Sequence, residues 1–228
     1  MPNHTKNRVK FIGDDSKIKE LINMYSTFHE SKPRKSYDGD LIYTKDDNYG
    51  WWNEERKVFK QRGKKDLKKI PNGFIQEFEE EYTSMPDFEK VIPPPNDDAY
   101  NDLPNQTEAK KSPNWWYTWN IKNWGTKWGG YCNVKISDNE YEFQTAWSAA
   151  FKIVEEIHKN FNDIKIEFTY ADEDSVYNCG KIIFENGLKY DYIPEGGTKE
   201  AYEIYFELNP EYKDDYVLID NNYKRKDN

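Results

Sequence analysis

Aromatic side chains are the feature that most limits how this chain can fold. Tyr, Phe and Trp make up 17% of the 228 residues, whereas Leu, Ile, Val and Phe together number only 44. A chain with so few of these apolar side chains lies near the composition of disordered proteins. Each aromatic ring, however, buries far more surface than an aliphatic side chain does. The sequence therefore predicts a folded domain whose core is built largely from rings.

The net charge limits which classes of molecule the chain can bind. The chain carries 33 basic and 42 acidic residues, which gives a formal net charge of −9. This excess of acid argues against a general duplex-binding protein, because phosphate contacts require a basic face. No apolar run reaches the roughly 18 residues of a membrane span, and the amino terminus lacks the apolar segment of a secretory signal. We therefore expect a cytoplasmic protein without a membrane partner, and the sequence indicates no oligomeric state.

The motifs of common catalytic and cofactor sites are missing from the sequence. It contains no G-x-S-x-G, P-loop, G-x-G-x-x-G, C-x-x-C or H-E-x-x-H pattern. The two cysteines, Cys132 and Cys179, are expected to be reduced thiols. His158 falls on a predicted helix, where we expect it to be exposed or half-buried rather than a general base. We therefore expect a protein that is not an enzyme and holds no metal and no cofactor.

Hydrophobic periodicity predicts an α+β domain. Apolar side chains alternate toward Val9 and Phe11 in a first strand, and a helical pattern follows, opened by a cap among Asp14, Asp15 and Ser16. Strand and helix then recur in the same order later in the chain. We expect one antiparallel sheet with both long helices on one face, arranged as a split β-α-β repeat. The expected strands are 4–12, 87–92, 140–147 and 163–170, and the expected helices are 15–28 and 149–161.

Turn signals organise the C-terminal part of the chain. Asn186-Gly187 favours a two-residue turn, which predicts a hairpin of strands 181–185 and 188–192. Thr198 is expected to cap a last helix. The charged tail from Lys213 onward is expected to fray.

The distribution of polar residues predicts how the chain is divided. A polar insertion occupies about 31–85, where turn residues flank a small hairpin formed by 41–43 and 51–52. We expect one domain over 1–195 that contains this insertion, followed by a helix and charged tail over 196–228.

Five of the eight tryptophans fall within 115–128. Ser112 as a cap and Pro113 at the first helical position predict an inserted helix that runs through Trp124, with Gly125 as its left-handed C′ residue. Its apolar spacing predicts one core-facing side. The side chains expected in the core are Tyr117, Ile121, Trp124 and Trp128 of this segment and Trp147 of the strand that follows.

The remaining tryptophans of this segment are the first part of a candidate binding site. Trp115, Trp116 and Trp119 cannot all share the core-facing side of the helix, so some of them should be exposed beside Lys122 and Lys127. Exposed indole rings beside lysines can stack on a base and pair with phosphate. The same rings can instead anchor a protein interface.

An acidic turn supplies the other two candidate site residues, Asp172 and Asp174. Carboxylates in a turn are typical of a solvated loop, and a weak divalent-cation site is the alternative. The turn lacks the glycine and the ligand spacing of an EF-hand.

Several short blocks of the sequence resemble the YubB/Api-like proteins of plasmids and bacteriophages. They occur in the family's order and span most of residues 1–185, whereas the tail and the part of the insertion at 31–70 match no block. The blocks are Met1-Pro2-Asn3-His4 with Asn7-Arg8-Val9, Phe11 and Gly13, then Phe88 to Pro93, Asn123-Trp124-Gly125-Thr126-Lys127-Trp128, Thr145-Ala146-Trp147-Ser148 and Tyr170-Ala171-Asp172-Glu173.

This resemblance implies a ferredoxin-like fold without an iron–sulfur cluster, and two cysteines could not supply the four thiolates of such a cluster. The family brings no established biochemical activity. Its setting in mobile elements implies an accessory or counter-defence role in the cytoplasm of a bacterial host.

Two functions remain open. The first is a non-catalytic inhibitor or adaptor that binds a host protein through aromatic anchors, and the acidic net charge favours it. The second is a binder of a nucleotide or single-stranded nucleic acid. That function would present Tyr141, Phe143 and Thr145 on an open sheet face, as RNA-recognition modules present their aromatic residues.

Overall fold

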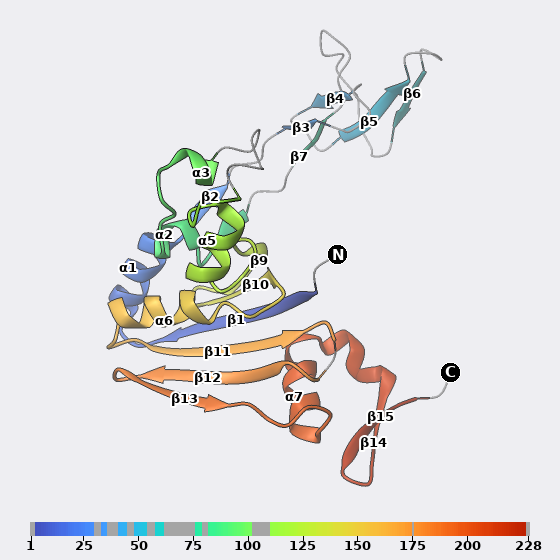
Figure 1. The fold of residues 1–228 in the computed structure, drawn as a ribbon. Coiled ribbons are helices and arrows are strands. Elements are labelled where there is room, and N and C mark those ends of the chain that lie inside the picture. The colour runs from blue at the N-terminus through green and yellow to red at the C-terminus, as the bar shows by residue number, and fades with distance from the viewer. Residues whose placement is uncertain are drawn as a thin grey trace. The chain divides into compact units, whose positions relative to one another are not determined.

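The computed structural model describes residues 3–29, 33–35, 41–44, 48–53, 58–61, 76–78, 82–101, 110–174 and 176–226. Two compact units divide the chain, and Figure 1 shows their elements. The first unit comprises Met1–Thr27 and Thr83–Asn228, and the second comprises Phe28–Tyr82. Strands β2 (Thr27–His29) and β8 (Tyr82–Ser84) lie where the chain passes from one unit to the other.

The described part of the first unit contains a six-stranded sheet and most of the helices. The sheet strands are β1 (His4–Ile12), β9 (Tyr131–Ser137), β10 (Glu140–Ala146), β11 (Lys165–Asp172), β12 (Cys179–Glu185) and β13 (Leu188–Tyr192). The helices are α1 (Asp15–Tyr25), α2 (Phe88–Val91), α3 (Asp98–Asn101), α5 (Trp116–Asn123), α6 (Phe151–Asn160) and α7 (Lys199–Leu208). A 3-10 helix η1 (Pro210–Asp215) and the strands β14 (Tyr216–Ile219) and β15 (Asn222–Arg225) complete it.

The sheet has the strand order β13-β12-β11-β1-β10-β9, and every neighbouring pair is antiparallel. β1 lies at the centre, so Thr5 faces Thr145 of β10 on one side and Asp172 of β11 on the other. The four strands β11-β1-β10-β9, with α1 and α6, form the split β-α-β arrangement. The predicted α+β fold class is therefore confirmed, and the hairpin β12-β13 extends the sheet at one edge.

One predicted strand of this sheet is wrong. Residues 87–92 form the short helix α2, whose N-cap Asp87 accepts a hydrogen bond from the Glu89 N–H at 3.0 Å. Phe88 and Val91 are both buried, and their spacing of three residues suits one helical turn as well as a strand. β9 takes the place of the missing strand in the sheet.

Alternate residues of the central strands face α1 and α6 and form the main core. Asp14 caps α1 as predicted, because its side chain accepts hydrogen bonds from the N–H groups of Ser16 and Lys17. The helix ends at Tyr25, three residues before the predicted end, since Ser26 is already extended and β2 follows. The buried core includes Val9, Phe11, Tyr141, Phe143, Ile166, Phe168 and Tyr170 from the strands and Ile18, Leu21, Tyr25, Ile153, Val154 and Ile157 from the helices.

A buried asparagine ties the start of α6 to the sheet. α6 begins two residues later than predicted, with Ala150 rather than Ser148 as its N-cap. The Ala150 N–H donates to Asn7 Oδ1 at 3.0 Å, and Asn7 Nδ2 donates to Thr145 Oγ1 at 2.8 Å. The Asn7 side chain on β1 therefore satisfies the buried N–H group of the N-cap residue, because buried polar groups must find partners.

His158 on α6 is buried, and the prediction that it is exposed or half-buried is wrong. Its ring lies 5.4 Å from that of Phe184 on β12. Neither ring nitrogen has a hydrogen-bond partner among the described residues. The hairpin β12-β13 extends the sheet under this side of α6, which the helical pattern alone did not show.

The opposite face of the sheet is covered at one end by α7. Ala171 of β11 and Cys179 of β12 point away from the main core and belong to a second core with Ala201 and Ile204 of α7. Thr198 caps α7 as predicted, because its Oγ1 accepts a hydrogen bond from the Ala201 N–H.

The C-terminal tail forms a hairpin, so the prediction that it frays is wrong. Strands β14 and β15 pair antiparallel. The ring of Tyr202 on α7 lies 5.3 Å from that of Tyr216 and 5.6 Å from that of Tyr223, and the ring of Phe206 lies 5.1 Å from that of Tyr223. Two tyrosines thus attach a mostly charged segment to α7.

The predicted hairpin around Asn186-Gly187 is confirmed. Both residues have positive φ, 52° and 74°, which a two-residue type I′ turn requires. Glu185 pairs with Leu188 across this turn.

Small antiparallel sheets are described in the second unit. They consist of β3 (Pro33–Lys35) with β7 (Gln76–Phe78), and of β4 (Leu41–Thr44), β5 (Asn48–Asn53) and β6 (Val58–Gln61). The predicted hairpin in this region is confirmed by the pairing of Leu41 with Trp51.

Candidate functional site

The tryptophan-rich segment forms a shorter helix than its sequence predicts. α5 begins at Trp116 with Trp115 as its N-cap, and Ser112 lies in a preceding turn, where its carbonyl accepts from the Trp115 N–H at 3.2 Å. Gly125 has φ +80° and follows the C-cap Trp124, as predicted. A left-handed residue at this position is the usual end of a helix.

The inward face of α5 differs from the predicted one. Trp124 is buried and its Nε1 donates to the Ile92 carbonyl at 2.9 Å, but Ile121 and Trp128 are exposed. Asn120 is buried instead, with its Nδ2 donating to the Lys127 carbonyl at 3.0 Å. A satisfied polar residue thus occupies a core position, which a count of apolar spacing cannot find.

Trp119 belongs to this inward face rather than to the surface. Its ring lies 5.5 Å from that of Trp124 and 5.6 Å from that of Tyr100. It packs against the main core and is not part of the surface described next.

Six aromatic rings and one lysine form a continuous surface, named here the aromatic patch. The ring of Trp115 lies 5.1 Å from that of Tyr117, and the ring of Tyr117 lies 6.1 Å from that of Trp147. The members of the patch are Trp115, Trp116, Tyr117, Lys127, Trp128, Tyr131 and Trp147.

Lys127 joins the two most exposed tryptophans of the patch. Its Nζ lies 4.5 Å from the ring centroid of Trp128 and 4.8 Å from that of Trp147. The two rings are 38% and 42% exposed. Cation–π attraction of this kind holds an ammonium group over an indole face. Two large apolar rings are therefore exposed to solvent, and one shared cation holds both of them in place.

Trp147 is exposed because its backbone leaves the strand. The sequence predicts that Trp147, at the end of the strand 140–147, lies in the core, and this prediction is wrong. Trp147 has φ +74°, a left-handed conformation that costs a non-glycine residue about 1–2 kcal/mol. Its N–H donates to the Asn3 carbonyl at 2.8 Å, which holds the turn in place.

Hydrogen bonds fix the two loops that carry these tryptophans. Ser148 Oγ donates to the Gly125 carbonyl at 2.5 Å, and Thr126 Oγ1 donates to the Trp128 carbonyl at 2.6 Å. The loop after α5 is therefore tied to the loop after β10. A patch held in one arrangement loses little conformational freedom when it binds.

Tyr131 forms the sheet end of the patch and contacts His4, which lies beside the patch. The Tyr131 Oη lies 2.5 Å from His4 Nδ1, and the ring of Tyr131 lies 6.4 Å from that of Trp128. Burial raises the pKa of Tyr131 to about 12, and the nearby Cys132 and Glu173 contribute in the same direction. The phenol therefore stays protonated near neutral pH and acts as a hydrogen-bonding group rather than as a phenolate nucleophile.

The two acidic candidate residues, Asp172 and Asp174, make hydrogen bonds that stabilise the fold. Asp172 is buried, with its Oδ1 accepting from the Asp174 N–H at 2.9 Å and its Oδ2 accepting from Thr5 Oγ1 at 3.3 Å. Asp174 Oδ2 accepts from Asn3 Nδ2 at 2.8 Å. In the described part of the chain, no group of three or more His, Cys, Asp or Glu side chains is placed to hold a metal ion.

The structure thus brings together only part of the predicted site. Trp115, Trp116 and Lys127 lie in the aromatic patch, whereas Trp119 packs against the main core and both aspartates are structural. Lys122 is exposed on α5, and its carbonyl accepts a hydrogen bond from Lys152. Sequence reasoning missed Tyr117, Trp128, Tyr131 and Trp147, because a strand or helix period places a residue on a face only while the regular element continues.

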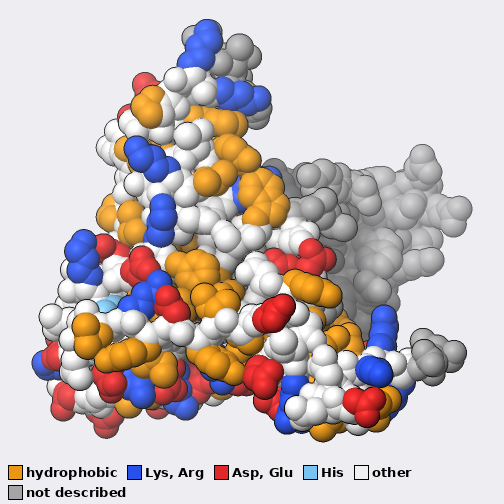
Figure 2. Space-filling view, turned by 60° about the horizontal axis from the view of Figure 1, so that its bottom comes forward, with side chains coloured by type: hydrophobic (Ala, Val, Ile, Leu, Met, Phe, Trp, Pro, Cys, Tyr) orange, Lys and Arg blue, Asp and Glu red, His pale blue; other side chains and the backbone are white. Residues whose placement is uncertain are grey.

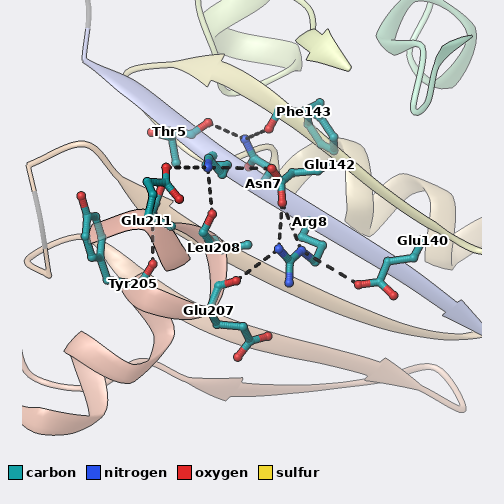
Figure 3. Close-up of polar contacts among 12 residues, drawn as sticks. Thr5, Asn7, Arg8, Glu140, Glu142, Phe143, Tyr205, Glu207, Leu208 and Glu211 are labelled. Carbon is teal, nitrogen blue, oxygen red and sulfur yellow. Dashed lines mark hydrogen bonds and ion pairs between the residues drawn. The ribbon is translucent and has the colours of Figure 1, made fainter. Parts of the chain in front are cut away.

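The open face of the central strands is charged and internally paired. Arg8 Nη2 donates to Glu142 at 2.9 Å and to the Glu207 carbonyl at the end of α7 at 3.2 Å (Figure 3). Lys6 Nζ donates to the Leu208 carbonyl at 2.8 Å, and Lys10 lies 3.4 Å from Glu140. Arg8 and Lys6 thus stabilise the carboxyl end of α7, which carries partial negative charge.

The residues proposed for an RNA-recognition surface lie on the other side of the sheet. Tyr141, Phe143 and Thr145 are all buried against the helices. The prediction that they line an open face is therefore wrong, because β10 turns its aromatic residues toward α1 and α6.

A family model matches part of the chain. Residues 123–209 match the family model described as a ferredoxin-like domain in Api92-like protein. This match confirms the resemblance to Api-like proteins and the ferredoxin-like fold over these residues, which run from the end of α5 to the end of α7. No curated protein and no solved structure matches the chain. Among the described helices, none is long and apolar enough to cross a membrane.

Proposed function

We propose that the protein is a non-catalytic binding protein of a phage or other mobile element, and the match of residues 123–209 to the model of a ferredoxin-like domain in Api92-like protein supports this proposal. It docks on a protein of its bacterial host, in the cytoplasm, through the aromatic patch. By occupying that host protein it serves an accessory or counter-defence role.

The exposed ring and the left-handed backbone of Trp147 are the observations that support this proposal most directly. A large apolar ring is exposed on a left-handed residue, and neither feature helps the chain to fold. Strained non-glycine residues persist where the surroundings hold them, and they cluster at functional sites. Trp is also one of the residue types enriched among the side chains that dominate protein interfaces. A binding surface accounts for the exposure and the strain together.

The lysines of this region favour a protein partner over a base. Lys127 lies over both Trp128 and Trp147, and Lys110 lies 5.7 Å from the ring centroid of Trp115. A stacked base needs a free ring face, and each of these cations already covers one of the two faces of its ring. The edges of the rings remain available to apolar side chains of a protein. The net charge of −9 also works against binding a polyanion.

The proposal is tested by capture with matched variants of the full chain. Immobilised native protein, the double variant Trp128→Ala with Trp147→Ala, and the control Tyr177→Ala are each incubated with lysate of a bacterial host. Tyr177 is a suitable control because it is another strongly exposed aromatic residue outside the patch. We expect the native and control proteins to retain the same host protein and the double variant to lose it.

Two results would overturn the proposal. Equal capture by the double variant would show that the patch is not the docking surface. Binding of a fluorescent oligothymidylate by the native chain, lost in the double variant, would assign the patch to single-stranded nucleic acid instead. Thermal melts of all three proteins establish that each one is folded.

A further inference from the structure

We propose that the free edge of β13 pairs with β13 of a second copy of the chain, so that two sheets join into one antiparallel sheet across a two-fold axis. This inference concerns the sheet edge opposite β9 and does not depend on the aromatic patch. It rests on the geometry of β13, on its exposed side chains and on the charge pattern of its five residues.

The two edges of the sheet differ in their protection. β9 is irregular, with two shifts in its register against β10 and a positive φ at Cys132. Bulges of this kind hinder pairing with another strand. β13 pairs with β12 in continuous register over all five residues, and the described part of the chain places no strand on its other side. β13 is therefore the edge that is open to pairing.

The side chains of β13 are unusually exposed for their apolar character. One face of β13 carries every second side chain, those of Leu188, Tyr190 and Tyr192. These side chains are 57%, 53% and 52% exposed. In Figure 2, which brings the β13 side of the molecule forward, hydrophobic side chains lie among acidic and basic ones. Large apolar side chains on a regular edge strand are the pattern that natural monomers avoid.

The turn determines which backbone groups of β13 are free. Glu185 and Leu188 flank a two-residue turn and form a hydrogen-bonded pair with each other. Hydrogen-bonded and non-hydrogen-bonded pairs alternate along an antiparallel ladder. The N–H and C=O groups of Lys189 and Asp191 consequently point away from β12, toward the open edge.

The sequence of β13 is complementary to itself in one antiparallel register. With Tyr190 facing Tyr190 of the second copy, Lys189 faces Asp191 of that copy and Asp191 faces its Lys189. The outward backbone groups are those of the same two residues, so both hydrogen-bonded pairs of the new ladder also join opposite charges. Leu188 faces Tyr192 on the other side of the sheet. Opposite charges and aromatic pairs across strands stabilise such a ladder. This complementarity singles out a second copy as the occupant.

The ion pairs already made by Lys189 are compatible with this arrangement. Lys189 Nζ lies 3.1 Å from Glu155 on α6 and 3.6 Å from Asp191 of its own strand. Both acids lie on the helix side of the sheet, where the second copy would add another aspartate. The resulting dimer carries one aromatic patch on each half, and two linked sites bind a multivalent partner more tightly than one.

Sedimentation velocity on the full chain over a range of concentrations tests the pairing. We expect a monomer–dimer equilibrium for the native protein. Asp191→Lys and Lys189→Asp should each be monomeric, because each places like charges opposite one another. The double variant K189D/D191K restores opposite charges and should dimerise again. Trp128→Ala with Trp147→Ala should dimerise like the native protein, which separates this inference from the proposed function.

A disulfide experiment tests the register itself. In a Cys132→Ser background, Tyr190→Cys should form a covalent dimer on mild oxidation, because a non-hydrogen-bonded pair on the two-fold axis brings the two Cα atoms to about 4.5 Å. Leu188→Cys is the matched control and should cross-link poorly, since its partner in this register is Tyr192. A native chain that stays monomeric at every concentration, or equal cross-linking at both positions, would overturn the proposal.

Discussion

Trp147 shows how much of the site depends on a single backbone angle. Its φ of +74° turns the ring out of the strand and into contact with Lys127. Thr145, two residues before it, is buried as the strand pattern requires. Sequence periodicity could predict the strand but not this turn, because glycine and asparagine are the usual signals of left-handed backbone.

Two variants of Trp147, one to glycine and one to alanine, separate the effect of backbone strain from the effect of ring packing. Both Trp147→Gly and Trp147→Ala remove the ring, but only glycine adopts a positive φ without penalty. We expect Trp147→Gly to be more stable than Trp147→Ala by about 1 kcal/mol. Urea unfolding of the two variants measures this difference. Equal stabilities would show that the turn relaxes when the ring is removed, and that the native residue is not strained.

The two cysteines occupy different environments and should react differently. Cys132 is exposed, whereas Cys179 is buried and its Sγ lies 3.5 Å from the Ala201 carbonyl. Burial raises the pKa of the Cys179 thiol to about 11, so very little reactive thiolate exists at pH 8. We expect Ellman's reagent to titrate one thiol rapidly in the native protein and two after denaturation. Rapid reaction of both thiols in the native state would contradict this assignment.

At the scale of elements, the errors of sequence reasoning have physical causes. Residues 87–92 satisfy a strand pattern, yet one helical turn capped by Asp87 buries the same two side chains. The inward face of α5 contains Asn120, whose polar character hides it from any apolar count. Short elements carry too few residues for their period to be decisive. The elements that repeat their pattern several times, β1, β10, β11 and α1, agree with the predicted ones to within three residues at each end.

The C-terminal hairpin should contribute to stability through its tyrosines. Tyr223 contacts Tyr202 and Phe206 of α7, so Tyr223→Ala removes two ring contacts from a partly buried position. We expect the free energy of unfolding to fall by about 1–3 kcal/mol. Leu218→Ala on the same hairpin is the control, because Leu218 is exposed and should change stability little. Equal stability of both variants would mean that the hairpin does not pack on α7 in solution.

At the scale of the whole molecule, the sequence predicts the class of fold but not the order of the strands in the sheet or the aromatic patch. The order of strand, helix and strand predicted the antiparallel sheet, and the ring-rich composition predicted its core. The position of β1 between β11 and β10 depends on contacts between distant residues, such as Asn7 with Thr145 and Ala150. Local patterns do not contain such contacts, and the aromatic patch depends on them because its members come from three separate segments.

Burial of ionisable groups should make the fold sensitive to alkali. Burial raises the pKa of Cys179 to about 11 and those of Tyr100, Tyr131 and Tyr170 to about 12, from ordinary values of 9.0 and 10.0. Between the ordinary and raised values the unfolded chain loses protons that the folded chain retains, so stability falls as pH rises. The contribution is fully present below about pH 9 and is lost progressively toward pH 12.

Urea unfolding at pH 8, 9.5, 10.5 and 11 measures this dependence. We expect a falling free energy of unfolding above pH 9, with the same trend in the control Cys132→Ser. A free energy that stays constant up to pH 11 would contradict the burial of these groups.

The affinity of the purified host partner for the native chain and for Trp147→Gly tests the central claim most directly. The claim is that the protein holds Trp147 exposed and strained in order to bind that partner. It predicts that Trp147→Gly folds normally but raises the dissociation constant at least about tenfold, which corresponds to about 1.4 kcal/mol. An unchanged dissociation constant for this folded variant would contradict the account.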